Sequence, residues 1–247
     1  MVLENTVSDK NNDAKLVSPA NALQKDTGEL AASEGHTLDE QFEEILLWAQ
    51  NRIGNEELVQ AREEFFWKMG KVFHDDPFYE NRMNYFLDYF ILERPAREKQ
   101  SAEASHRTPF NLFEDEKGQC QNGPIAMTGF RHSVFEVRKH QSDSVLVIDL
   151  ITDKKFEISA RPTESFRLLQ KKQIFQGFVY ELGEVHYLSR GLLFHPDRAA
   201  KIVKKTIKNA RKSGEFSDQR LLSTFAKHNL RFLRHSNLDP KRIYSEL

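Results

Sequence analysis

The sequence predicts an α+β fold: a small five- to six-stranded antiparallel β-barrel or curved sheet flanked by N-terminal and C-terminal helices. The first observation is a block of β-type patterns at 133–195, where Ser133–Arg138 and Lys155–Ala160 alternate between apolar and polar side chains. Within this block, Val145–Ile148 is apolar on both faces, as in a covered strand. The second observation is that apolar residues before the block, and again after Pro196, recur at helical spacing.

Composition and pattern divide the 247 residues into four regions. Residues 1–36 are polar and lack periodicity, so they cannot bury enough apolar surface to offset chain ordering and are expected to form a disordered tail. The other three regions, expected to form one compact unit over 37–247, are a helical region with exposed loops at 37–132, the barrel at 133–195 and a basic helical region at 196–247.

Capping signals predict the first two helices. Thr37 and Glu40 form a capping box, in which each side chain bonds an otherwise unpaired amide, and Gly54 is expected to end the helix that follows. The second helix is expected to begin at Asn55 and to close at Gly70.

The third helix is expected to be the centre of the N-terminal part. Asp76 is placed to cap it and Pro77 to occupy its first position, and the helix should stop before Pro95 because a residue before proline resists the helical conformation. Its apolar side chains, Phe86 among them, cover much of its circumference. A helix of this kind is packed on several sides.

Thr108 and Pro109 form a second pair of a capping residue and a proline at the first helical position, and this pair predicts one short helical turn. Exposed loops are expected on either side of it, at 96–107 and 114–123. The only cysteine, Cys120, lies in the second loop and is expected to be an exposed, unactivated thiol; a single cysteine excludes an internal disulfide.

Five strands are expected in the β block, the last one extending through Phe194. Their expected bounds are 133–139, 144–151, 155–160, 173–181 and 184–190. Asp153 and Gly183 are expected to adopt left-handed conformations in two tight turns. Gly177 inside the fourth strand indicates a bulge or a close crossing, and residues 161–172 are expected to form a helical turn that plugs one end of the barrel.

The C-terminal region predicts a basic amphipathic helix with an apolar stripe of Ile202, Val203, Ile207 and Ala210. The rest of its surface carries the candidate contacts to nucleic acid or another partner: Lys201, Lys204, Lys205, Lys208, Arg211 and Lys212. A second helix is expected to begin at the cap Ser217, with Phe216 and Leu221 as a hydrophobic staple. Asp239-Pro240 predicts a last short turn of helix.

Three segments resemble an uncharacterised bacterial protein family. They are Tyr85–Pro95, an aromatic helix ending in Arg-Pro; Arg107–Phe113, an Arg-Thr-Pro turn; and Asp149–Ile158, which is similar to the family pattern DLxTGExFEV and is followed in register by Ile174–Leu182. The resemblance covers roughly residues 80–195 and implies an aromatic helix, a turn and a small β-barrel in that order.

The chain departs from that family at two places. Asp153 stands where relatives often have Gly, and Lys171-Lys172 replaces a Gly-Asp turn. Some relatives also carry a zinc-binding tail of the SEC-C type, whose cysteines this chain lacks. The resemblance therefore implies a fold and transfers no activity.

The net charge of −1 conceals a gradient along the chain. Residues 1–94 carry 19 acidic and nine basic side chains, a balance of −10, whereas residues 196–247 carry five acidic and 13 basic ones, a balance of +8. Either the basic C-terminal region binds a polyanionic partner, or the acidic and basic regions pack beside each other with opposite charges facing. Since no apolar run approaches the ~20 residues of a membrane helix and no secretory signal is present, a cytoplasmic protein without membrane insertion is expected.

The sequence contains no recognisable catalytic motif, phosphate-binding loop or cofactor site, and we expect a non-enzymatic protein-interaction or regulatory module, with another protein as its partner. The first alternative is nucleic-acid binding through the barrel and the basic helices, with Phe175, Phe178, Tyr180 and Tyr187 as stacking rings. The second is an enzyme whose site is assembled from distant residues. His74-Asp75-Asp76 is a compact cluster of metal-capable side chains, but helix capping already explains Asp76, so no metal or cofactor is expected. The oligomeric state stays open.

Overall fold

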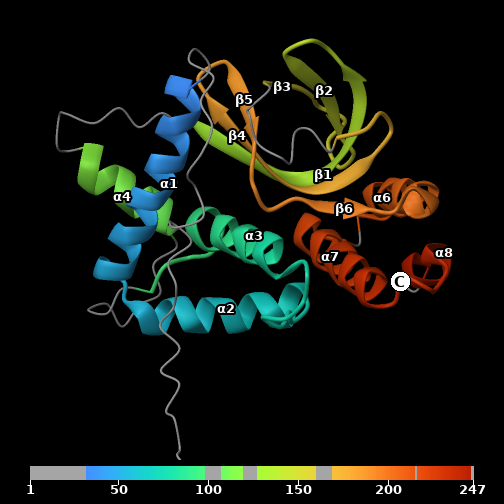
Figure 1. Cartoon of the computed structure of the whole chain (residues 1–247), viewed down its shortest axis with the longest axis horizontal. Coiled ribbons are helices and arrows are strands. Elements are labelled where there is room, and N and C mark those ends of the chain that lie inside the picture. Colours follow the sequence, from blue (N-terminus) through green and yellow to red (C-terminus); the bar gives the residue numbers. More distant parts are fainter. Residues whose placement is uncertain (1–31, 98–106, 119–126, 160–168, 215, 246–247) are drawn as a thin grey trace, which may run out of the picture.

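The computed structural model describes residues 32–97, 107–118, 127–159, 169–214 and 216–245. It consists of a curved sheet with helices from both ends of the chain packed against it (Figure 1). The helices are α1 (Ala32–Arg52), α2 (Asn55–Met69), α3 (Tyr79–Leu92), α4 (Pro109–Gly118), the short turn η2 (Asp197–Ala199), α6 (Ala200–Ser213), α7 (Asp218–Arg234) and α8 (Pro240–Tyr244). The strands are β1 (Gly129–His140), β2 (Ser144–Asp149), β3 (Lys155–Ser159), β4 (Ile174–Leu182), β5 (Val185–Leu188) and β6 (Leu193–His195).

The strands form a ring that is nearly closed. The long strand β1 pairs antiparallel with β2 and with β4, and β2 pairs antiparallel with β3. β3 meets β5 in parallel, and β5 returns to β4, so the order around the ring is β1-β2-β3-β5-β4. β6 pairs with the first residues of β4. The α+β class with a small, curved, six-stranded sheet is therefore confirmed.

Local geometry explains the curvature of the sheet. The register of β1 against β2 shifts between Val137 and Lys139, which is a β-bulge in β1 and not, as one alternative had it, in β4 at Gly177. The other alternative for Gly177, a close crossing, is confirmed, because a Cβ there would lie 2.6 Å from Cδ2 of Leu192. Asp153 has the expected left-handed conformation, with φ of 61°.

The structure corrects three expectations about the N-terminal helices. α1 begins at Ala32, so the Thr37–Glu40 capping box lies inside a helix instead of starting one. Oδ2 of Asp76 accepts a hydrogen bond from the amide of Phe73 (2.9 Å), and α3 begins at Tyr79 with no side-chain cap. α4 continues to Gly118, through a stretch of helix-forming residues that was expected to be a loop.

The C-terminal signals are confirmed. The side chain of Ser217 accepts a hydrogen bond from the amide of Arg220 at the start of α7, and Asp239 caps α8 in the same way, with Pro240 at its first turn. The expectations for residues 1–31, for the loop segments 98–106 and 119–126 with Cys120, and for 161–168 of the barrel plug expected at 161–172 fall outside the described residues. The last four residues of that plug, 169–172, are described and form no helix.

Three groups of buried side chains hold the elements together. The barrel interior contains Phe135 and Phe175, and the outer face of β1 near Val134 packs against α6, α7 and α8. The third group lies between the helices α1, α2, α3 and α4 and the outer face of β4. Phe86 on α3 belongs to this group and is 1% exposed. The central position expected for the third helix is confirmed.

Asp88 of α3 is buried against β4, and we predict that it makes stability depend on pH. Tyr180 donates a hydrogen bond to Oδ1 (2.5 Å), but no described group bonds Oδ2. Burial raises the pKa of Asp88 to about 7, although hydrogen bonds from Tyr180 and Ser189 partly offset this. Between pH 4 and 7 the folded state therefore holds a proton that the unfolded state has lost, so this group's contribution to stability falls as the pH rises.

Replacement of Asp88 by a residue that does not ionise should remove this part of the pH dependence of the free energy of unfolding. Relative to wild type, Asp88→Asn should become more stable by roughly 2 kcal/mol as the pH is raised from about 5 to about 7. The measurement is urea unfolding of both proteins across this range. Parallel stability profiles for the two proteins would show that Asp88 ionises normally in the folded state.

Candidate functional site

The helix α6 presents a basic face to solvent because its apolar residues are spaced to lie on one side. Val203, Ile207 and Ala210 are buried in the cluster that includes Val134 of β1, and Gly214 ends the helix in a left-handed conformation with φ of 68°. The six cations singled out from the sequence are all exposed: Lys201, Lys204, Lys205, Lys208, Arg211 and Lys212. The orientation expected for this helix is confirmed.

Four of these cations form a single stripe. Lys201, Lys205, Lys208 and Lys212 recur at helical spacing, and the 11 steps from the first to the last span about 16 Å along the axis. Within the part of the chain that the structure describes, no carboxylate lies within 4 Å of their ammonium groups. The stripe is therefore an uncompensated row of positive charge.

A groove of about 530 Å³ separates α6 from the barrel. Its wall on the barrel side comes from β1 and from the turn between β2 and β3. The residues that line it are Glu136, Arg138, Leu150, Asp153, Lys204, Lys208, Arg211 and Lys212. Four of the six candidate residues thus line one groove, whereas Lys201 and Lys205 lie on the same helix outside it.

Two carboxylates in the groove hold part of its charge in place. Glu136 is almost fully buried; Lys204 donates a hydrogen bond to its Oε1, and Nη2 of Arg138 lies 3.2 Å from its Oε2. Asp153 pairs with Arg211 at 2.6 Å. These pairs join two cations of α6 to the barrel, and with five cations and two carboxylates the groove keeps a net positive charge.

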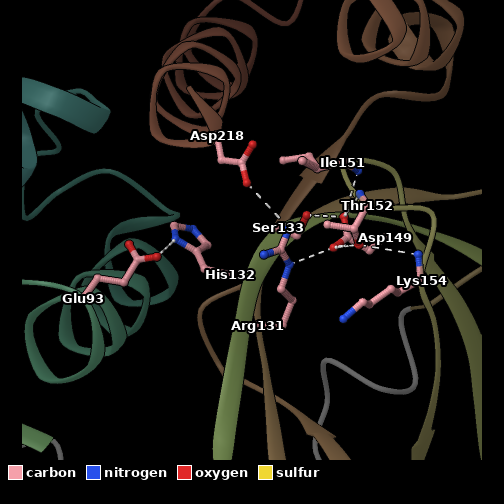
Figure 2. Close-up of polar contacts among 9 residues, drawn as sticks. All are labelled: Glu93, Arg131, His132, Ser133, Asp149, Ile151, Thr152, Lys154 and Asp218. Atoms are coloured by element: carbon pink, nitrogen blue, oxygen red, sulfur yellow. Dashed lines mark hydrogen bonds and ion pairs between the residues drawn. The ribbon is translucent and has the colours of Figure 1, made fainter. Parts of the chain in front are cut away.

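The buried carboxylate of Asp149 builds the turn that carries Asp153. Figure 2 shows Ser133, Arg131 and Thr152 converging on it from β1 and from the turn. The amides of Ile151 and Thr152 also donate to Oδ1, and the amide of Asp149 donates to the carbonyl of Lys154 (2.8 Å). Burial alone would raise the pKa of Asp149, but these hydrogen bonds outweigh it and hold the pKa below its usual value.

The outer face of β2 and β3 adjoins the groove, because Glu136, which lines the groove, is opposite Ile148 of β2. On this face Glu136 of β1 is opposite Ile148, which is opposite Lys155, and Leu146 is opposite Glu157. Leu146 and Ile148 are partly exposed. Figure 1 shows α3, α6 and α7 beside the other strands and, among the described helices, none over β2 and β3. Within the described residues, this outer face is therefore uncovered and presents two apolar side chains among charged ones.

The acidic helices do not cover α6. Figure 1 places α1 and α4 at the other end of the molecule from α6, and α2 packs against α7, not against α6. One ion pair between the acidic and basic regions joins Arg234 of α7 to Asp76 (2.8 Å). One explanation for the charge gradient was that the acidic N-terminal region packs against the basic C-terminal region. This packing is found at α7, whereas α6 stays exposed.

The rings expected to stack on bases are not available for that role. Phe175 points into the barrel and is fully buried, and Phe178 lies under α3, where it stacks on His132 with a centroid distance of 4.1 Å. Tyr180 and Tyr187 are also buried. Alternation along a strand could not reveal this, because helices cover the outer face of β4.

A second hollow, of about 250 Å³, is lined in part by Glu93 and His132. Nδ1 of His132 lies 2.8 Å from Glu93, and its Nε2 lies 2.6 Å from the hydroxyl of Tyr85, to which Gln176 donates a hydrogen bond. Burial raises the pKa of Tyr85 well above its ordinary value. Both ring nitrogens of His132 are engaged and the Tyr85 hydroxyl keeps its proton. This series of hydrogen bonds therefore fastens α3 to the sheet, and the Tyr85 hydroxyl is not activated as a nucleophile.

Comparisons with protein-family models, with curated proteins and with solved structures give no match to this chain. None of the described helices has the length and apolar character needed to cross a membrane. The described residues include no group of three or more His, Cys, Asp or Glu side chains arranged to hold a metal ion, and Asp76 of the His74–Asp76 cluster is engaged by Arg234.

Proposed function

We propose that the protein binds single-stranded nucleic acid, with the phosphates along α6 and the bases over the outer face of β2 and β3. The observation that carries the proposal is the uncompensated stripe of Lys201, Lys205, Lys208 and Lys212 beside an open groove. Lysine ammonium groups neutralise phosphates and release their counterions, which is the main source of sequence-independent affinity. The groove beside the stripe has a net positive charge, because five cations and two carboxylates line it.

The strand order supports the same proposal. A ring of five strands in the order β1-β2-β3-β5-β4, with β3 parallel to β5, is the order of the OB-type barrels. These barrels bind oligonucleotides and oligosaccharides across the face of their second and third strands. This is an analogy at the level of fold and supports a function only together with a suitable site. Here no described helix covers the same face, and the groove beside α6 adjoins it.

The composition of the face favours a single strand bound without sequence preference. Leu146 and Ile148 offer apolar contact to bases, whereas the four rings proposed for stacking, Phe175, Phe178, Tyr180 and Tyr187, are buried. Affinity should therefore come mainly from phosphate contacts and depend strongly on salt. The protein partner expected from the sequence would need a different surface.

Fluorescence anisotropy of labelled oligonucleotides tests this proposal. For a single strand of about 15 nucleotides, we expect log K to fall with log salt at a slope of roughly −3, because four phosphate contacts each contribute about −0.7. A duplex of the same length should bind more weakly, since it is too wide to lie in the groove. No binding at ~50 mM salt would refute the proposal, and equal affinity for the duplex would refute the single-strand assignment.

A further inference from the structure

The second hollow, of about 250 Å³, lies where α2, α3 and β1 meet the start of α7. Lys68 and Met69 line it from α2, Glu93 from the end of α3, His132 from β1 and Arg220 from α7. None of its described lining residues also lines the groove beside α6. Small-molecule sites are typically concave places of this kind, and because drug-sized ligands need about 300–1,000 Å³, this hollow suits a smaller molecule.

The hollow is lined by hydrogen-bond donors that lack acceptors. Cζ of Arg220 lies 4.6 Å from the centroid of the Phe216 ring, and no described residue accepts a hydrogen bond from this guanidinium. Lys68 donates one hydrogen bond to the hydroxyl of Tyr89 (2.9 Å), which leaves its other ammonium hydrogens without a described acceptor. The hydroxyl of Ser217 accepts a hydrogen bond from the amide of Arg220 (3.3 Å), and its own hydrogen has no acceptor within the described residues. These donors are available to a ligand that accepts hydrogen bonds.

The described lining also carries a net positive charge. It contains two cations and one carboxylate, and no described carboxylate lies within 4 Å of either cation. The one carboxylate, Glu93, lies 2.8 Å from Nδ1 of His132, and Figure 2 shows these two side chains pointing toward each other. Asp218, at the start of α7, lies 3.7 Å from Arg131, toward which it points in the same figure. A ligand that complements this hollow is therefore an anion.

We infer that the second hollow binds a small molecule through a phosphate or carboxylate group. Arg220 donates two parallel hydrogen bonds to the oxygens of this group, as guanidinium groups commonly do with both kinds of anion. Lys68 and Ser217 donate to the same group. The rest of the ligand contacts the apolar side chains of Met69 and Leu222.

The donors are held in place before the ligand binds. The guanidinium of Arg220 rests on the ring of Phe216. The ammonium group of Lys68 is held by the hydroxyl of Tyr89, and Ser217 is fixed as the cap of α7. Because less side-chain freedom is then lost on binding, the affinity for a small anion increases.

A methyl NMR titration of the full chain with inorganic phosphate tests the inference. At constant ionic strength, the methyl groups of Met69 and Leu222 should shift and saturate with a midpoint on the order of 1–10 mM, because a small anion makes only a few hydrogen bonds. A second titration with acetate distinguishes the two ligand classes: a lower midpoint for phosphate assigns the site to phosphate esters, and a lower midpoint for acetate assigns it to carboxylates. Sodium chloride should give no saturating shift.

Arg220→Gln is the decisive variant. It removes the charge and the paired donors at an exposed position, so the midpoint should rise at least about tenfold while the fold is kept. Arg220→Lys keeps the charge but not the parallel donors, and its midpoint should lie between those of Arg220→Gln and the wild type. Lys208→Gln, the control, removes the same charge from the groove and should leave the midpoint unchanged.

The methyl groups of Leu150, which lines the groove, separate binding in the groove from binding in the hollow. Phosphate-dependent shifts at Leu150 with none at Met69 and Leu222 would show that the anion binds only beside α6 and would overturn the inference. The inference also fails if Met69 and Leu222 do not saturate below about 100 mM of either anion, or if Arg220→Gln has the midpoint of the wild type.

Discussion

Phe86→Ala is expected to lower the free energy of unfolding by about 3–5 kcal/mol. Phe86 lies on α3 with 1% exposure, and its ring is 5.5 Å from that of Phe65 and 6.2 Å from that of Phe90. Truncation leaves a cavity between helices that cannot all move to fill it, because α3 is also fastened to the sheet through Tyr85 and Asp88. Urea unfolding followed by circular dichroism measures the change.

Phe73→Ala is the matched control for this experiment. It removes the same ring from a position that is 51% exposed, so its cost should stay below about 1 kcal/mol. Equal costs for the two substitutions would place the face of α3 that carries Phe86 outside the core. That result would contradict the central position of this helix.

Replacement of Lys201, Lys205, Lys208 and Lys212 by Gln is expected to remove most of the affinity for single-stranded nucleic acid. At a slope of roughly −0.7 per phosphate, four contacts contribute about 2.8 decades of affinity at ~0.1 M salt relative to 1 M, so the loss should be roughly 600-fold. The remaining salt dependence should be nearly flat. All four side chains are exposed, and the fold should not change.

The control for that variant removes the same charge elsewhere. Lys71, Lys227, Lys241 and Arg242 are exposed and do not line the groove, so their replacement by Gln should reduce affinity only slightly. Equal losses in the two variants would show that binding follows net charge and not the stripe on α6. The comparison therefore separates a specific surface from a general electrostatic attraction.

Signals confined to a few neighbouring residues were sufficient for much of the fold. The caps Ser217 and Asp239 are correct because a cap depends on the amides two or three residues ahead. The Thr37–Glu40 capping box failed because the same residue types are also tolerated inside a helix, and the box cannot show that the preceding residues continue it. The prediction that Asp76 caps α3 was wrong because a distant partner, Arg234, competes for its carboxylate.

The candidate site was predictable only in part. Helical spacing was enough to place Lys204 and Lys208 on an exposed face of α6. The opposite wall of the groove was not predictable, because Glu136 and Asp153 reach it only through the pairing of β1 with β2 and the turn built on Asp149. Contacts between distant segments carry no local signal.

The most direct test of the nucleic-acid interface is a methyl NMR titration of the full chain with a single-stranded oligonucleotide. The methyl groups of Leu146 and Ile148 on the open face, and of Leu150 in the groove, should shift as the oligonucleotide is added. Those of Leu47 and Leu233, which are exposed on α1 and α7, should not. Shifts at Leu47 and Leu233 with none at Leu146, Ile148 and Leu150 would contradict the account.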